Sequence, residues 1–214
     1  MDGDKIERKT GTTTVGLICK DGIVLAADRR ATAGTFIATK KTEKIHKITN
    51  DIAVTMAGTA SDAQLLIKYV QSELSLKEIR TNIKTTAKEA ANLFARFVYS
   101  NIRKISMIPG ISHFILGGYD KSGFSLYDIY ADGSITQCDD FVSSGSGSVM
   151  VYGVLDTLYK KDMSVDEGIK LAVKCVNAAL QRDSASGDGI DVFTITKDGA
   201  KKVFEQEIET RVKL

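Results

Sequence analysis

Residues 11–30 read GTTTVGLICKDGIVLAADRR and combine two short apolar runs with a turn between them. The runs 13–19 and 23–27 are rich in Val, Ile, Leu and Thr, which is typical of strands. Asp21-Gly22 separates them, and an Asp-Gly pair between apolar runs is a strong signal for a tight hairpin. The stretch therefore predicts antiparallel strands, and not the helical crossovers that parallel sheets need.

The same punctuation recurs further along the chain. Asp120 to Gly123, Asp132-Gly133 and Asp198-Gly199 each interrupt apolar segments and predict further hairpin turns. The expected strands are 112–119, 124–130, 192–196 and 201–204, with another at 52–56.

Four segments between these strands have apolar residues at helical spacing. They cover about 62–74, 84–104, 146–160 and 164–181. Ile105 continues the apolar face of the second segment, Pro109-Gly110 ends it, and Ser164 with Glu167 forms a capping-box pattern at the start of the fourth. Because strands and helix pairs alternate, two antiparallel sheets packed face to face, each covered by one helix pair, would bury both helical faces.

The composition predicts one globular domain. The chain has 214 residues, of which 43% are hydrophobic and 26% charged, and its net charge is +2, so no overall field favours nucleic acid or a membrane surface. No signal-like apolar region or bilayer-length apolar run is present in the sequence. Cys19, Cys138 and Cys175 lack metal-site or disulfide spacing and are expected to be reduced core thiols of a cytoplasmic protein. Two histidines supply neither a zinc site nor a Ser-His-Asp site well.

Thr12 is the candidate nucleophile. A threonine hydroxyl needs a nearby base, and cleavage before Thr12 would create one from its own α-amine, whose pKa is near ~8 in peptides. Gly11 suits such a cleavage because it leaves the backbone free to bend and its carbonyl exposed.

Other candidate groups each have an ordinary structural interpretation. Asp28 and Lys44 would supply the carboxylate and the cation that such a nucleophile needs, or would be solvated surface. The serines around Ser146 open a helix without a phosphate-loop pattern, and the segment 183–187 reads equally as a polar turn.

Taken together, these segments resemble a proteasome β subunit of the archaeal type, among the N-terminal-nucleophile hydrolases. The matching residues follow the family order from residue 11 to about 195. They are Gly11-Thr12-Thr13-Thr14-Val15-Gly16, Ala26-Ala27-Asp28-Arg29-Arg30-Ala31-Thr32, Lys44-Ile45, Met56-Ala57-Gly58, Gly145-Ser146-Gly147-Ser148 with Tyr152-Gly153, and Gln181-Arg182-Asp183-Ser184-Ala185-Ser186-Gly187. The resemblance implies an α+β fold, a four-layer αββα sandwich of two antiparallel sheets flanked by helix pairs. It also implies a propeptide at 1–11, removed autocatalytically, and a catalytic domain at 12–214.

The resemblance also implies a role for each site residue. Thr12 would be the amino-terminal nucleophile, with Asp28 and Lys44 paired beside it and the Gly58 N–H as oxyanion donor. On the other side, the amine and an ordered water would be held by Ser146, Asp183 and Ser186.

The implied substrate site is a peptide groove with an apolar pocket. Thr32 and Ala60 match positions whose backbone pairs with an extended peptide. Met56 matches the pocket floor and Ala31 its wall, which favours cleavage after hydrophobic or aromatic residues. Asp188 lies close to the implied site, and its carboxylate is expected to point to water.

The implied activity is that of a threonine endopeptidase, hydrolysing unfolded polypeptides through an acyl-enzyme without metal or cofactor. The subunits would form heptameric β rings between two α-subunit rings, supplied by an unfolding ATPase. Neither nucleic acid nor a membrane is an expected partner. Two alternatives remain: the bacterial two-ring peptidase of the same superfamily, and a silent subunit that only builds the ring.

Overall fold

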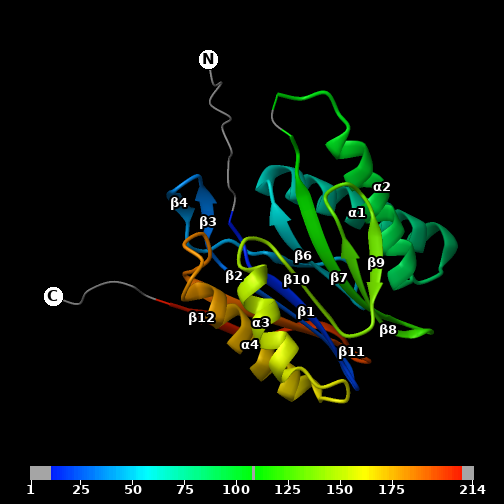
Figure 1. Cartoon of the computed structure of the whole chain (residues 1–214). Coiled ribbons are helices and arrows are strands. Elements are labelled where there is room, and N and C mark those ends of the chain that lie inside the picture. Colours follow the sequence, from blue (N-terminus) through cyan, green and yellow to red (C-terminus); the bar gives the residue numbers. More distant parts are fainter. Residues whose placement is uncertain (1–10, 108, 209–214) are drawn as a thin grey trace.

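The computed structural model describes residues 11–107 and 109–208 and shows four layers, with helices outside and two sheets inside (Figure 1). Helices α1 (Ala60–Thr81) and α2 (Ala87–Ile102) cover one sheet, and α3 (Ser148–Leu158) and α4 (Val165–Leu180) cover the other. The sequence order of strands, helix pair, strands, helix pair and strands is confirmed, as is the αββα sandwich.

Both sheets are antiparallel and contain five strands among the described residues. The first has the order β10 (Phe141–Ser144), β1 (Thr14–Cys19), β2 (Gly22–Asp28), β11 (Gly189–Thr196) and β12 (Gly199–Glu207). The second has the order β5 (Ile45–Lys47), β6 (Ile52–Gly58), β7 (Ser112–Asp120), β8 (Gly123–Ile129) and β9 (Ile135–Cys138). A separate hairpin, β3 (Ala31–Ala33) with β4 (Phe36–Thr39), follows β2.

Three apolar clusters hold the layers together. Phe94 of α2 packs on Phe114 of β7 between the first helix pair and its sheet, with ring centroids 5.1 Å apart. Cys175 belongs to the cluster under α4, and Leu25 and Ile115 face each other between the sheets. Burial of these faces removes apolar surface from water at about 25 cal/mol per Å², which makes the layered arrangement favourable.

The helices differ from the sequence prediction mainly at their ends. Helix α1 continues past Leu74 to Thr81, because the polar segment that follows contains good helix formers and nothing interrupts it before Asn82, which adopts the left-handed conformation (φ 53°). Helix α2 starts later than predicted, at a capping box formed by Thr86 and Glu89. Helix α2 also ends at Ile102, so Ile105 lies beyond it and is fully exposed. The prediction that Ile105 continues the apolar helix face was wrong.

Five strands were not predicted, because they are only three or four residues long and show no clear apolar alternation: β3, β4, β5, β9 and β10. The capping box of Ser164 and Glu167 at α4 is confirmed. None of the helices in the described ranges has the length and apolar character needed to span a membrane.

Candidate active site

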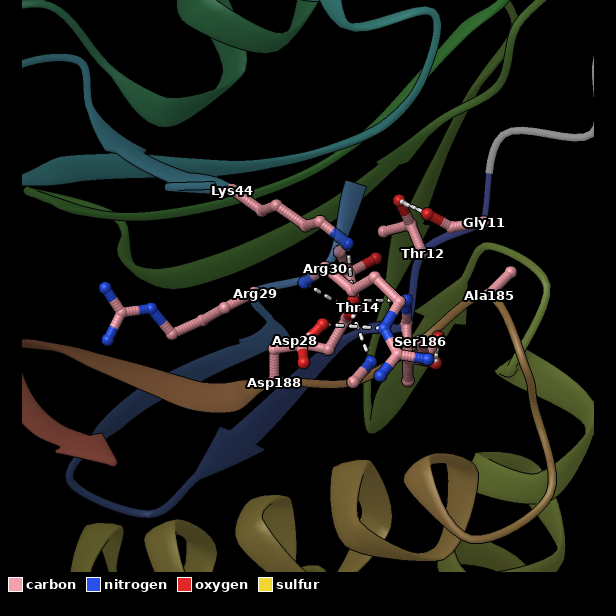
Figure 2. A network of polar contacts seen from close by, with 12 residues as sticks. Gly11, Thr12, Thr14, Asp28, Arg29, Arg30, Lys44, Ala185, Ser186 and Asp188 are labelled. Atoms are coloured by element: carbon pink, nitrogen blue, oxygen red, sulfur yellow. Dashed lines mark hydrogen bonds and ion pairs between the residues drawn. The ribbon is translucent and has the colours of Figure 1, made fainter. Parts of the chain in front are cut away.

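Thr12 lies two residues before the start of β1 and is buried, with 5% of its surface exposed. Its backbone N–H donates to Ser146 Oγ at 3.2 Å, and its hydroxyl donates to the Gly11 carbonyl at 2.6 Å. Figure 2 shows this second contact at the point where Gly11 leads into the site. Because Gly11 is still attached, the Thr12 nitrogen is an amide here, and the residue has no free amine.

Asp28 ends β2 beside the start of β1, because the antiparallel register pairs Thr14 with Ala27. Its carboxylate accepts four hydrogen bonds. Oδ1 accepts from Lys44 Nζ at 2.6 Å and from the Thr13 N–H at 2.9 Å, and Oδ2 accepts from the N–H groups of Arg30 and Gly187, both at 3.0 Å. The full set of donors explains how a fully buried carboxylate is tolerated.

Lys44 is 3% exposed and reaches Asp28 from the segment before β5 (Figure 2). Burial lowers the pKa of Lys44 below its ordinary value, and the adjacent Asp28 carboxylate opposes that shift. The pKa of a lysine in this environment lies closer to neutral pH than that of a surface lysine. A pKa perturbed in this way is typical of functional groups.

Ser146, Asp183 and Ser186 form one hydrogen-bonded group next to Thr12. Both serine hydroxyls donate to Asp183 Oδ2 at 2.6 Å. Ser186 Oγ also lies 2.7 Å from Thr13 Oγ1, while Ser146 holds the Thr12 N–H as above. The segment around 183–187 therefore contacts Thr13 and Ser146 and is not merely a polar turn.

A pocket of about 50 Å³ opens beside Thr12. Its lining contains every residue predicted for the substrate site, together with Thr12 and Lys44. The lining residues are Gly11, Thr12, Ala31, Thr32, Thr42, Lys44, Met56, Ala57, Gly58, Ala60 and Ala63. Sequence reasoning missed Ala57 and Ala63; the spacing of Ala63, three residues after Ala60 on one helix, was the available signal.

Two glycines allow close backbone contacts in this region: Gly58 lines the pocket, and Gly145 lies against Thr12. Gly58 has φ +104°, and a Cβ there would lie 2.2 Å from the Ile111 carbonyl oxygen. Gly145 has φ +96°, and a Cβ would lie 2.0 Å from the Thr12 carbonyl oxygen. A side chain at either position would meet both a left-handed backbone and fixed neighbouring atoms.

Asp188 and Thr32 make side-chain contacts that the sequence did not predict. Asp188 does not point to water: its side chain is 2% exposed and pairs with Arg30, whose Nε donates to Asp188 Oδ2 at 2.7 Å. Thr32 lines the pocket, and its side chain contacts Gly11, since Thr32 Oγ1 accepts from the Gly11 N–H at 3.1 Å.

Cys19 and Cys175 are buried free thiols as predicted, whereas Cys138 is only half-buried. Among residues 11–107 and 109–208, no three His, Cys, Asp or Glu side chains converge in a way that could hold a metal ion.

Comparison with known proteins gives a consistent family. Residues 8–195 match the family described as Proteasome subunit. The chain is 45% identical to the proteasome subunit beta of Ferroglobus placidus over 98% of its own length and 97% of the relative's. It is 44% identical to that of Archaeoglobus profundus (96% and 93%) and 41% identical to that of Methanosarcina barkeri (98% and 97%).

Proposed function

The chain belongs to the proteasome subunit family, as a beta-type subunit, and from this we propose that Thr12 is the nucleophile of a threonine endopeptidase. The observation that carries the proposal is the convergence near Thr12 of two polar groups, one buried and one partly exposed, and one pocket. Asp28 and Lys44 form the first group, and Ser146 with Asp183 belongs to the second. Family membership alone implies protease activity only in general, so the assignment rests on this geometry.

The first step of the proposed mechanism is removal of residues 1–11. Thr12 Oγ1 already contacts the Gly11 carbonyl group, and attack of that oxygen on the carbonyl carbon would transfer the leader from nitrogen to oxygen. The Gly11–Thr12 C–N bond breaks in this shift, which frees the Thr12 amine. Water then hydrolyses the ester, which releases the leader and restores the Thr12 hydroxyl. The leader itself, apart from Gly11, lies outside the described residues.

Peptide hydrolysis would use the same groups. The neutral amine of Thr12 takes the proton from its hydroxyl, the oxygen attacks the substrate carbonyl, and the proton passes to the leaving amine. Lys44 stabilises the negative charge that develops near the hydroxyl, and the Gly58 N–H serves as oxyanion donor. Ser146, Asp183 and Ser186 orient the freed amine, and water releases the acyl group.

We further propose cleavage after hydrophobic or aromatic residues. Met56, Ala31 and Ala63 make the pocket largely apolar, and a flexible thioether adapts to large side chains. Removal of the leader also takes Gly11 out of the lining, which enlarges the space. Thr32 and Ala60 at the pocket edge would align an extended substrate.

For assembly we propose the arrangement that the family implies: two inner heptameric rings of this chain, flanked by α-subunit rings, in the cytoplasm, and supplied with unfolded polypeptide by an ATPase. Such confinement would keep the site away from folded proteins. Negative-stain microscopy tests it, because six-fold rings would instead indicate the bacterial two-ring peptidase.

The activity is tested on particles assembled from this chain and its α subunits. Wild-type particles should lose residues 1–11, measured by intact mass, and a threonine-reactive peptide inhibitor should add to Thr12, located by peptide mapping. Thr12→Ala should do neither, whereas Thr12→Ser should retain leader removal because it keeps the hydroxyl. A wild-type chain that keeps its leader and takes up no inhibitor would support the silent ring subunit instead.

A further inference from the structure

The loop joining α4 to β11, residues 181–188, contains a buried carboxylate for which the proposed reaction has no use. Asp188 adopts a left-handed backbone (φ +64°) between Gly187 and Gly189, and its side chain is 2% exposed. A residue with a side chain rarely takes this conformation, and a carboxylate is rarely buried without a partner. Both features indicate that other contacts hold Asp188 in place.

Arg30 supplies those contacts, and it touches the loop at three points. Its Nε donates to Asp188 Oδ2 at 2.7 Å, and its Nη1 donates to the Ser184 carbonyl oxygen at 2.9 Å. The guanidinium also lies against the Gly187 backbone, where a Cβ would come within 2.4 Å of Cζ. Lys40 adds a weaker ion pair, with its Nζ 3.8 Å from Asp188 Oδ1.

The two segments joined by the Arg30–Asp188 pair also both contact Asp28, the proposed catalytic carboxylate. The backbone N–H of Arg30 and that of Gly187 both donate to Asp28 Oδ2 at 3.0 Å. The Arg29 N–H donates to the Gly187 carbonyl oxygen at 3.2 Å, which ties the same two segments together. The Arg30–Asp188 pair therefore closes a ring of contacts around one side of Asp28 (Figure 2).

The same loop carries Asp183 and Ser186. We propose that Asp188 is a positioning residue, which acts through Arg30 to hold loop 181–188 where Ser186 and Asp183 reach Thr13 and Ser146. The inference rests on the proposed function for its catalytic consequence, because Ser146 in turn contacts the nitrogen of Thr12. The loop position itself does not depend on that function.

The neighbouring arginine provides a matched control. Arg29 Nη1 pairs with Glu205 Oε1 at the same distance of 2.7 Å, but Arg29 points away from the cluster in Figure 2. Glu205 lies on β12 and is about half-exposed. Glu205→Gln therefore removes a similar charge pair from the adjacent residue without touching loop 181–188.

The test compares assembled particles of the wild type with Asp188→Asn, Asp188→Gly, Arg30→Lys, the double variant Arg30→Lys/Asp188→Asn and Glu205→Gln. Asp188→Gly relieves the left-handed backbone, so it keeps the test open if Asp188→Asn assembles poorly. Two measurements are made: amide hydrogen exchange of the peptide covering 183–190, and kcat and KM for an apolar fluorogenic peptide, normalised to inhibitor-titrated sites.

We expect faster exchange in loop 181–188 and a fall in kcat of about 10-fold in both Asp188 variants and in Arg30→Lys, with KM within about two-fold. KM should hold because Asp188 does not line the pocket. The double variant should be no worse than the poorer single variant, since both changes break one unit. Glu205→Gln should match the wild type in both measurements.

If loop 181–188 of the Asp188 variants exchanges its amide hydrogens at the same rate as the wild type, the positioning role is overturned, whether or not the particles hydrolyse peptides. Faster exchange with unchanged kcat, or effects that multiply in the double variant, would overturn its catalytic consequence. If wild-type particles show no hydrolysis while exchange in the variants rises, the proposed function fails and the structural part of the inference stands.

Discussion

Lys44 Nζ lies 2.6 Å from Asp28 Oδ1, and this pair connects the two sheets of the sandwich at the edge where Thr12 sits. Asp28 is the last residue of β2 in one sheet, and Lys44 directly precedes β5 in the other. The separation of the sheets at this edge therefore sets the distance between carboxylate and ammonium. A buried pair of this kind is expensive to desolvate, so its presence is better explained by chemistry than by stability.

Replacement of Lys44 should abolish function while leaving the fold intact. Lys44→Ala removes the cation near Thr12 and should slow both leader removal and peptide hydrolysis by at least about 100-fold. Folding should survive because Asp28 keeps three backbone N–H donors. Intact mass and peptide turnover measure the effect. Lys41→Ala is the control, since Lys41 is 69% exposed and forms an ion pair with Glu207 on β12. Normal processing in Lys44→Ala would remove Lys44 from the site.

The lowered pKa of Lys44 predicts how stability depends on pH. Between its folded value and its ordinary value of 10.5, the unfolded chain binds more protons than the folded chain. The free energy of unfolding should therefore gain a positive slope as pH rises through the alkaline range below 10.5. Urea unfolding of uncleaved Thr12→Ala measures it, against Thr12→Ala/Lys44→Met, which lacks the group. Equal slopes in the two proteins would contradict the pKa assignment.

Two glycines at helix α3 should respond oppositely to alanine. A Cβ at Gly147 would lie 1.9 Å from Thr13 Oγ1 and 2.8 Å from Ala179 Cβ. Gly147→Ala should thus cost about 1–3 kcal/mol and displace Thr13, blocking leader removal. Gly153 is exposed within α3 and has open space around it, so Gly153→Ala should stabilise by about 0.5–1 kcal/mol. Thermal unfolding measures the stability of both variants, and intact mass measures leader removal. Normal leader removal in Gly147→Ala would show that the new Cβ is accommodated without displacing Thr13.

The three cysteine thiols should be alkylated more slowly than reactive cysteines. Burial raises the pKa of Cys19 and Cys175 to about 12, and that of the half-buried Cys138 to about 11. At pH 8 the native protein should label at Cys138 first, about 100-fold more slowly than the urea-unfolded chain, and Cys19 and Cys175 should stay unlabelled. Mass spectrometry of an alkylation time course measures this. Rapid labelling of Cys175 would show that α4 opens readily.

The alternation of strands and helix pairs could be predicted because it depends on local patterns. The Asp21-Gly22 turn, the capping box at Ser164 and the apolar face containing Phe94 each act within a few residues, and the structure bears them out. Failures arose where the local signal was weak. Strand β5 has only three residues, and helix α1 continues beyond the last residue of its apolar pattern, Leu74.

The amino-acid sequence by itself determined which groups were available for chemistry: Thr12 behind a glycine, Asp28 at a strand end, and Lys44 after a polar run. Only the tertiary structure decided that Ser146, 134 residues away, reaches the Thr12 nitrogen, and that Asp188 turns inward to Arg30 rather than outward to water. The physical reason is that side-chain direction at such positions is set by sheet pairing and loop closure between distant segments. Neither leaves a periodic trace along the chain.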